Sequence, residues 1–370
     1  MFLSALVYAS EHRAVVPCSL LSLSQVPFAS AALVTGGLSW VLPRRVSERI
    51  DNSLYRCYMR LCLFVFENVS GVDLVVSGDV DELLQKRENA VILSNHQSNA
   101  DWAVISMLAA RHSPEGSIES IRFMVKHSIQ YVPLFGWYIY QHGYIFVRRG
   151  FGFSAASAAV GKQLSWMDSL APPPDYPPFW LLIFPEGTRK SEKTLETSAV
   201  FREEVQPCPL SQVLSPRAGG FQFALERLSH LQAVYDVTIA YSQTRSTSGS
   251  APGMFSFVCC PPSSTVHVHV KRIGKQALPE AEGGACREWM EERFMEKEKL
   301  LENYRQTGHL DAATERVLPS IPIGTTGLPT ALFLSAIAAA FLSPNGRLVY
   351  AATIATAPLL ILGLKLNTCA

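Results

Sequence analysis

The chain has 370 residues, of which 48% are hydrophobic, and its 32 basic and 31 acidic residues give a formal net charge of +1. This length can bury a complete α/β core, and the hydrophobic content exceeds what such a core needs. The balance of charges does not indicate a nucleic-acid-binding surface. No P-loop, dinucleotide fingerprint or zinc-type cysteine pattern is present.

The N-terminal region is expected to be membrane-associated. Residues 14–43 contain no charged side chain, which is long enough to cross or lie in a bilayer. The stretch is too long for the apolar part of a cleaved signal peptide. Its basic residues, Arg44, Arg45 and Arg49, also follow it, whereas those of a signal peptide come first. We therefore predict an anchor whose downstream side faces the cytosol. Residues 53–67 mix arginines with large apolar side chains, which fits an interfacial amphipathic helix or, equally, a helix packed in the core.

The middle of the chain, residues 71–310, alternates apolar runs with helical stretches. This pattern predicts an α/β domain with a mixed, largely parallel sheet flanked by helices. Residues 242–264, rich in serine, glycine and proline, are expected to leave the core, whereas residues 285–305 read as an amphipathic helix laid against the domain. The candidate strands span residues 72–77, 90–93, 144–147, 179–184, 234–240 and 266–273.

The C-terminal region contains two apolar stretches, residues 327–343 and 348–364, separated by a short Pro-Asn-Gly-Arg segment. Each is at the short limit for a helix that spans a bilayer. We expect a membrane hairpin within residues 325–366, either spanning or re-entrant. Together with an anchor and interfacial helix in residues 1–70, it would flank the central domain with apolar helices.

A histidine and an aspartate lie five positions apart directly after the predicted strand 90–93. His96 could take a proton from an alcohol only if one ring nitrogen were free and the other were held, and a carboxylate is the usual holder. Five residues of ideal helix rotate by about 140°, so the pair would diverge inside one helix. We therefore expect His96 on the turn after the strand and Asp101 one turn into the next helix. By spacing alone, a buried histidine beside a surface acid is the commoner arrangement.

A second motif, residues 184–189, has the sequence Phe-Pro-Glu-Gly-Thr-Arg and follows the predicted strand 179–183. Loops at the carboxyl ends of strands line the ligand crevice of open α/β sheets. Two motif-bearing loops that each end a strand therefore indicate one shared site.

At these residues the chain resembles the glycerophospholipid acyltransferases, which include the 1-acylglycerol-3-phosphate acyltransferases. The NHxxxxD motif of that family matches residues 95–101, FPEGTR matches residues 184–189, and GxxFxxR matches residues 143–149. The similarity extends over nearly the whole chain. It implies a membrane-bound enzyme that moves a fatty acyl group from acyl-CoA to the sn-2 hydroxyl of 1-acylglycerol-3-phosphate, giving phosphatidic acid.

The resemblance also implies roles for individual residues. His96 would be the general base and Asp101 would orient it, with direct transfer and no enzyme nucleophile. Arginines suit the substrate phosphate because a planar guanidinium offers paired hydrogen bonds, and backbone amides near the His96 turn are the expected oxyanion donors. No metal or cofactor is expected beyond acyl-CoA as co-substrate. The residues expected to contact substrate are Asn95, Lys126, Gly143, Arg149, Glu186, Gly187, Thr188 and Arg189.

Two alternatives stay open. One is a lysophospholipid or lysocardiolipin acyltransferase, and the other is a noncatalytic lipid-binding membrane protein on the same fold. The resemblance implies the endoplasmic reticulum membrane with the catalytic domain facing the cytosol, and the mitochondrial membrane is the alternative location. Acyl-CoA, a lysophospholipid and the membrane are the expected partners, and nucleic acid is not. The sequence leaves the oligomeric state open.

Overall fold

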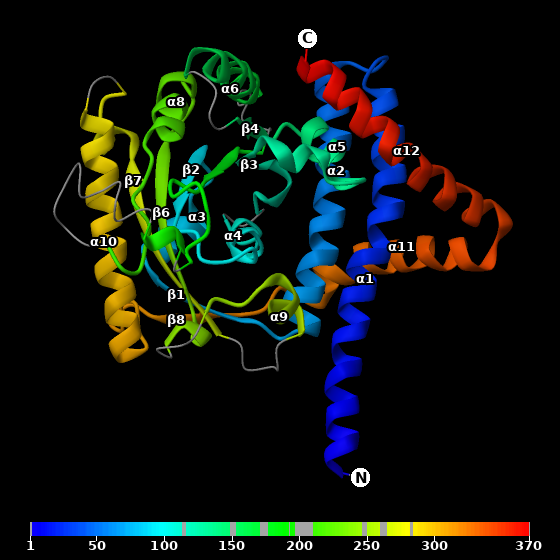
Figure 1. Ribbon diagram of the computed structural model, residues 1–370, viewed down its shortest axis with the longest axis horizontal. Helices are drawn as coiled ribbons and strands as arrows, with labels where there is room; N and C mark the ends of the chain where they lie inside the picture. Colours follow the sequence, from blue (N-terminus) through cyan, green and yellow to red (C-terminus); the bar gives the residue numbers. More distant parts are fainter. Residues whose placement is uncertain are drawn as a thin grey trace.

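A computed structural model describes residues 2–112, 116–148, 153–170, 177–191, 193–196, 210–245, 250–259, 265–281 and 284–369 of the chain. Its centre is an eight-stranded sheet with the order β4-β3-β5-β2-β6-β7-β1-β8 (Figure 1). The strands are β1 (Asp73–Gly78), β2 (Ala90–Ser94), β3 (Ile121–Lys126), β4 (Ile145–Val147), β5 (Trp180–Ile183), β6 (Ala233–Tyr241), β7 (Thr265–Gly274) and β8 (Arg316–Leu318).

The sheet is mixed and largely parallel, as the sequence predicts. β6 runs antiparallel to β7 and β8 runs antiparallel to β1, whereas the other neighbouring strands are parallel. All six predicted strands are confirmed. β3 and β8 were not predicted, because Arg122 interrupts the apolar run of β3 and β8 has only 3 residues.

Helices cover both faces of the sheet, and side chains of β2 show the division. Ala90 and Ile92 belong to one buried cluster, while Val91 and Leu93 belong to another on the opposite face. The predicted helix over residues 285–305 is observed as α10. The flanking helices are α3 (Val80–Gln85), α4 (Asp101–Ala109), α5 (Phe135–Gln141), α6 (Phe153–Asp168), α8 (Gly219–Arg227), α9 (Met254–Cys259) and α10 (Ala285–Thr307).

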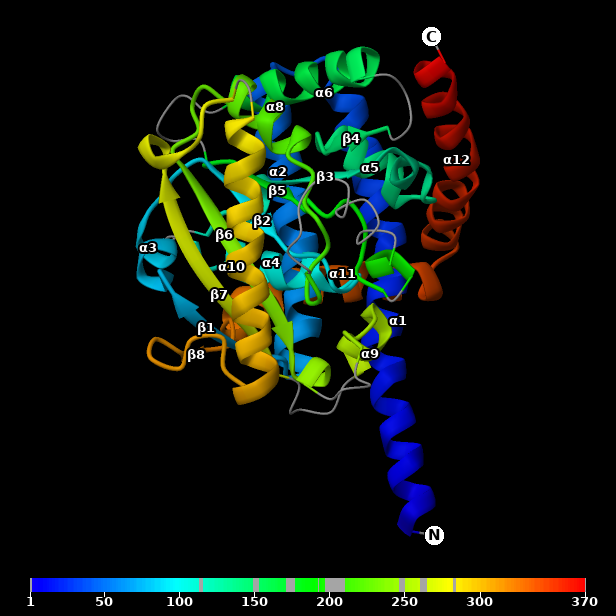
Figure 2. The same ribbon diagram turned by 60° about the vertical axis from the view of Figure 1, so that its left-hand side comes forward.

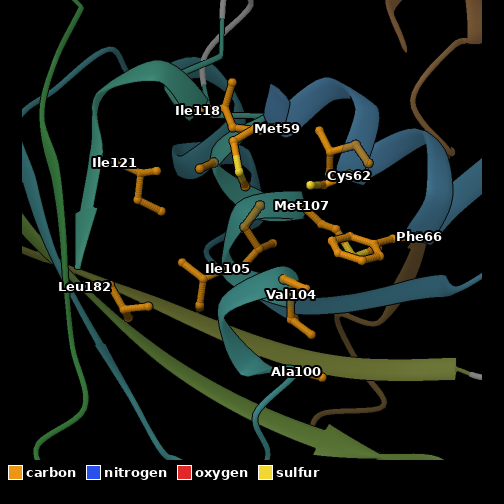
Figure 3. Close-up of a cluster of buried hydrophobic side chains, with 14 of the residues drawn as sticks. Met59, Cys62, Phe66, Ala100, Val104, Ile105, Met107, Ile118, Ile121 and Leu182 are labelled. Atoms are coloured by element: carbon orange, nitrogen blue, oxygen red, sulfur yellow. The ribbon is translucent and has the colours of Figure 1, made fainter. Parts of the chain in front are cut away.

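The two N-terminal helices are α1 (Phe2–Leu38) and α2 (Arg44–Leu63), and a short π-helical segment, η1 (Phe64–Val69), follows α2. α2 is a core-packing helix, because it contacts α1 and buries side chains in the same cluster as α4. The structure thus decides between the two alternatives for this segment. Figure 3 shows part of the shared cluster, with labelled residues from α2, α4 and the sheet: Met59, Cys62, Val104, Ile105, Met107, Ile121 and Leu182.

Three described helical segments are long and apolar enough to cross a membrane, namely residues 15–38, 323–342 and 344–363. The last two lie in α11 (Ile323–Leu342) and α12 (Pro344–Cys369), which meet at Ser343 and form a V rather than a tight hairpin (Figure 1). Both helices contact α1, and α12 runs beside it in Figure 2. The N-terminal part of α1 projects beyond the sheet domain. These apolar helices gather on one side of the protein and are consistent with membrane association.

The segment 242–264 does not leave the core as expected, as far as it is described. Phe257 and Val258 of α9 are buried, and α9 packs against α1 and η1. The expectation was wrong because composition alone does not show that apolar residues 254–259 form a helix with a buried face. Residues 246–249 and 260–264 lie outside the described part of the chain.

Candidate active site

His96 and Asp101 meet at the carboxyl end of β2. His96 Nδ1 lies 2.8 Å from Asp101 Oδ2, and Asp101 begins α4 rather than lying one turn inside it. Asp101 is fully buried, whereas the His96 side chain keeps 21% of its surface exposed. The pair that the sequence singles out is therefore assembled, with its acid below the surface and its imidazole reaching the surface.

Several donors hold the Asp101 carboxylate. Its Oδ2 accepts hydrogen bonds from the backbone N–H groups of Gln97 (2.8 Å) and Ser98 (2.9 Å), and its Oδ1 accepts one from the Tyr241 hydroxyl (2.5 Å). These donors replace the water that a buried carboxylate loses. Because Asp101 accepts at His96 Nδ1, the proton of a neutral ring sits on Nδ1. No described residue hydrogen-bonds to Nε2, which is the nitrogen that could receive a proton.

Glu186 links the two motifs from below. Its Oε1 accepts a hydrogen bond from the His96 backbone N–H (2.8 Å), and its Oε2 accepts one from Leu214 N–H (3.2 Å). Burial raises the pKa of Glu186 to about 8, although these two donors oppose the shift. Because the Glu186 side chain is nearly fully buried and accepts both hydrogen bonds from backbone N–H groups, it supports the His96 turn. Its contact with substrate stays a prediction.

The Phe184–Arg189 loop, defined by its FPEGTR sequence, holds His96 at further points. The Phe184 ring stacks on the imidazole with centroids 4.1 Å apart, and Lys190 N–H donates to the His96 carbonyl oxygen at 2.9 Å. Gly187 turns the loop at a φ of 67°, in the left-handed region that favours glycine. His96 is thus held at its ring face, its backbone N–H and its backbone carbonyl by Phe184, Glu186 and Lys190.

The backbone amides of the His96 turn are already committed. His96 N–H donates to Glu186, while the N–H groups of Gln97 and Ser98 donate to Asp101. None of the three is left to stabilise an oxyanion. The expectation that this turn supplies the oxyanion donors therefore does not fit these amides, because they orient the Asp101 carboxylate and the turn itself.

Two further expected contacts lie in the scaffold. Asn95 is fully buried, and its carboxamide exchanges two hydrogen bonds with the backbone of Ile239, at 2.8 and 2.9 Å. Gly143 has a φ of 82°, and an added Cβ would lie 2.2 Å from the Trp166 ring. Asn95 thus joins β2 to β6, and Gly143 lets α6 approach, while their contacts with substrate stay predictions.

The polar and cationic candidates are exposed. Lys126 ends β3, which runs parallel to β5 with Phe123 opposite Leu182, so Lys126 lies at the same sheet edge as the FPEGTR loop. Thr188 and Arg189 are exposed on that loop. Arg149 lies outside the described residues. The structure therefore leaves Lys126, Thr188 and Arg189 accessible to an anion near the strand ends.

α10 supports the site through Glu298, which sequence reasoning missed. The Glu298 carboxylate accepts hydrogen bonds from the backbone N–H groups of Ser211 (2.7 Å), Gln212 (2.8 Å) and Val213 (3.1 Å). The next residue, Leu214, donates to Glu186. A run of contacts thus leads from α10 through this loop to the His96 turn.

Lys297, also on α10, is a second missed residue. It is fully buried, forms an ion pair with Asp236, and donates hydrogen bonds to the carbonyl oxygens of Val237 (2.6 Å) and Leu93 (3.3 Å). Burial lowers its pKa. Lys297 therefore ties the carboxyl end of β2 to the middle of β6. No local signal reveals it, because Glu296-Lys297-Glu298 has the composition of a solvated helix face.

Comparisons with known proteins identify the family to which the sequence is similar. The sequence model of the Acyltransferase family matches residues 76–242, and that of the Acyltransferase C-terminus matches residues 256–327. The mouse 1-acyl-sn-glycerol-3-phosphate acyltransferase epsilon is 33% identical over 95% of this chain and 96% of its own length. A probable 1-acyl-sn-glycerol-3-phosphate acyltransferase 5 from Arabidopsis thaliana is 31% identical over 72% of this chain and 66% of its own length.

Other relatives carry a different substrate in their names. Lysocardiolipin acyltransferase 1 of Danio rerio is 28% identical over 70% of this chain and 62% of its own length.

The crystal structure of a 1-acyl-sn-glycerophosphate acyltransferase from Thermotoga maritima has 16% sequence identity and a TM-score of 0.46, and the match covers 79% of this chain and 98% of that one.

The matches define the class of this protein, which is an acyltransferase. More narrowly, the chain belongs to the glycerophospholipid acyltransferase family. Its similarity to the epsilon relative over nearly the full length agrees with the resemblance of its motifs to the 1-acylglycerol-3-phosphate acyltransferases.

Proposed function

We propose that the protein transfers a fatty acyl group from acyl-CoA to the sn-2 hydroxyl of 1-acylglycerol-3-phosphate, forming phosphatidic acid and free coenzyme A. The observation that carries the proposal is the His96–Asp101 pair, in which a buried carboxylate holds Nδ1 and leaves Nε2 available. Relatives named for this substrate support the choice of acceptor.

The reaction follows from the geometry of the ring. His96 Nε2 accepts the proton of the acceptor hydroxyl as its oxygen attacks the thioester carbonyl, and Asp101 stabilises the resulting imidazolium. The tetrahedral intermediate then expels the thiolate of coenzyme A, whose reference pKa is about 8.5. That thiolate takes up the proton from the imidazolium, which restores neutral His96. The enzyme forms no covalent intermediate.

The acceptor phosphate needs cationic groups near the strand ends. Arg189 and Lys126 lie at the edge where His96 emerges, and Arg149 ends the third family motif. We assign these three residues to the phosphate because guanidinium and ammonium groups bind it through charge-assisted hydrogen bonds. Replacing Arg189 by Ala should raise KM for the lysophospholipid more than it lowers kcat.

An acyltransferase assay on the full chain in detergent tests the proposal. The purified protein is given radiolabelled oleoyl-CoA and, in separate reactions, lysophosphatidic acid, monolysocardiolipin, lysophosphatidylcholine and no acceptor. We expect labelled phosphatidic acid to exceed every other product, and we expect the His96→Ala variant to form none. Retained product in that variant would overturn the general-base assignment.

The same panel decides between this function and its alternatives. The lysocardiolipin relatives favour monolysocardiolipin as a second candidate acceptor, and preferred labelling of cardiolipin would replace the present choice. A noncatalytic lipid-binding protein would consume no acyl-CoA with any acceptor. Release of free oleate in the reaction without an acceptor would instead indicate a thioesterase.

We further propose that the protein works on the cytosolic face of the endoplasmic reticulum membrane. The three apolar helical segments support membrane attachment, and the arginines after residue 43 favour the cytosolic side for the sheet domain. Protease protection of epitope-tagged protein in intact microsomes tests the orientation, and co-localisation with mitochondrial markers would support the mitochondrial alternative.

A further inference from the structure

Two cysteines that are far apart in the sequence meet between α1 and α9. The sulfur atoms of Cys18 and Cys259 lie 3.7 Å apart across a separation of 241 residues. Neither cysteine is in a disulfide bond, and both are half-buried. The contact belongs to a larger interface, because α9 packs along α1 and against η1.

The segment that carries Cys259 also contacts the turn between His96 and Asp101. The Ser98 hydroxyl donates a hydrogen bond to the Pro252 carbonyl oxygen, and Met254 N–H donates to Asn99 Oδ1 at 2.7 Å. Ser98 in turn donates its backbone N–H to Asp101. The Cys18–Cys259 contact therefore lies between the apolar helix α1 and the segment that supports the turn holding His96.

The other described cysteines lack this arrangement. Burial raises the pKa of the Cys62 thiol to about 12 and that of the Cys286 thiol to about 11. Because the thiolate is the reactive form, these two groups are chemically quiet near neutral pH. Among the cysteines that the structure describes, Cys18 and Cys259 form the one pair within hydrogen-bond distance.

We propose that Cys18 and Cys259 are a redox-modification site whose oxidation ties α1 to α9 through a disulfide bond. Hydrogen peroxide is the oxidant class: one thiolate attacks it to give a sulfenic acid and hydroxide, and the second thiol displaces water from that sulfenic acid. Two thiols are thereby oxidised and one peroxide is reduced to two waters. Small side-chain rotations must bring the sulfurs to about 2.05 Å.

A reducing environment keeps accessible thiols as thiols, so the pair would stay reduced there. The bond would form during oxidative exposure and be reversed by thiol reductants. Once formed, it would link the membrane-associated helix covalently to the support of the catalytic loop. Because the closed loop is long, the link should also stabilise the folded chain relative to the unfolded one.

Disulfide mapping tests the site without using enzymatic activity. The full chain in detergent, with Cys208, Cys260 and Cys369 replaced by Ser, is treated with hydrogen peroxide, alkylated and digested for mass spectrometry. We expect one cross-linked peptide pair joining Cys18 to Cys259, lost on treatment with dithiothreitol and absent from the Cys18→Ser variant. Alkylated Cys18 and Cys259 after oxidation, or Cys18 joined to Cys57, would overturn the proposal.

Thermal unfolding of the same samples provides the second readout. Oxidation should raise the unfolding midpoint of the parent protein, and the rise should vanish in the Cys18→Ser and Cys259→Ser variants. Formation of the bond without a rise in the midpoint would show that it does not tie α1 to the folded domain. Neither readout depends on the proposed acyl transfer, so failure of one proposal is distinguishable from failure of the other.

Discussion

Two histidine–aspartate pairs in this protein share one contact and differ in everything around it. In each, the histidine Nδ1 lies against an aspartate oxygen, in His96–Asp101 at the end of β2 and in His142–Asp51 between α5 and α2. The His96 ring reaches the surface and its Nε2 has no hydrogen-bond partner among the described residues. The His142 ring is fully buried, and its Nε2 accepts a hydrogen bond from Arg122 at 2.7 Å.

The difference shows what makes a histidine a base. Burial, reinforced by Arg122, lowers the pKa of His142 to about 4, so this ring stays neutral and cannot easily take up a proton. Tyr55 stacks on it at 4.0 Å and closes the remaining space. A carboxylate at Nδ1 is therefore not sufficient, and the second nitrogen must be both free and accessible. Substitutions at these residues should therefore have different effects on rate and on stability.

The largest effect is expected from removing the His96 imidazole. His96→Ala should reduce kcat by about 10⁴-fold, at the upper end of what general-base catalysis contributes. Its thermal midpoint should stay close to that of the parent protein, because the ring is partly exposed. Steady-state kinetics and circular dichroism measure the two quantities, and unfolding of this variant would place His96 in the scaffold alongside His142.

The next effect concerns the partner of the ring. Asp101→Asn should lower kcat by about 10²–10³-fold with little change in KM, because an amide N–H facing Nδ1 would move the ring proton to Nε2. The Asn side chain keeps the size of Asp101 and can still accept from Tyr241. A kcat within threefold of the parent value would show that the carboxylate does not set the tautomer.

The buried pair should respond in stability rather than in chemistry. Asp51→Ala removes the carboxylate that accepts the hydrogen bond of His142 Nδ1, and leaving a buried donor unsatisfied costs about 1–3 kcal/mol. We expect a lower unfolding midpoint and nearly unchanged kcat per folded molecule. Chemical denaturation and active-site-normalised rates check both halves. A large loss of kcat at unchanged stability would give this pair a catalytic role.

Acidification should destabilise the folded protein through the buried His142. The folded pKa of His142 lies near 4, below its ordinary value of 6.5, so the unfolded chain binds the proton first as the pH falls. His142 therefore removes stability progressively between about pH 6.5 and pH 4. Replacing His142 by Gln should weaken the fall in the free energy of unfolding between pH 6.5 and pH 4, measured by chemical denaturation at each pH. The pKa of buried His112 is also lowered to about 4, so His112 contributes in the same direction. Because His112 is present in the parent protein and in the His142→Gln variant, some pH dependence remains in both.

The comparison also shows how far sequence reasoning reaches. The His96–Asp101 pair could be predicted because both residues lie in one short turn after an apolar strand. Tyr241, Lys297 and Glu298 could not, because they approach the site only when β6 and α10 fold against β2. Their chain positions carry no mark of that proximity.

The missed strand β3 has a similar cause. Arg122 breaks its apolar pattern, yet the structure buries this side chain against His142 and Asn52, which come from distant segments. Asn95 and Gly143 are expected to contact substrate because they belong to recognised motifs. The structure adds that Asn95 bonds to the Ile239 backbone and that Gly143 lies against Trp166, so both also shape the backbone around the site.

The smallest effect is expected at a third pair, His230–Asp168. Nδ1 of His230 lies 3.0 Å from Asp168 Oδ2, and 45% of the ring is exposed, so its second nitrogen is accessible. It nevertheless precedes β6, whereas His96 follows β2, and these strands are parallel. The two rings therefore lie at opposite ends of the parallel strands β2 and β6, and His230 is away from the site around His96.

His230→Ala should leave kcat and KM within about twofold of the parent values and change stability by about 0.5 kcal/mol or less. The same kinetic assay and denaturation curve measure it, with His96→Ala in parallel. A loss of activity comparable to that of His96→Ala would mean that an accessible histidine–aspartate pair acts regardless of its sheet edge. An unchanged rate would show that access counts only where the carboxyl ends of the strands gather the rest of the site.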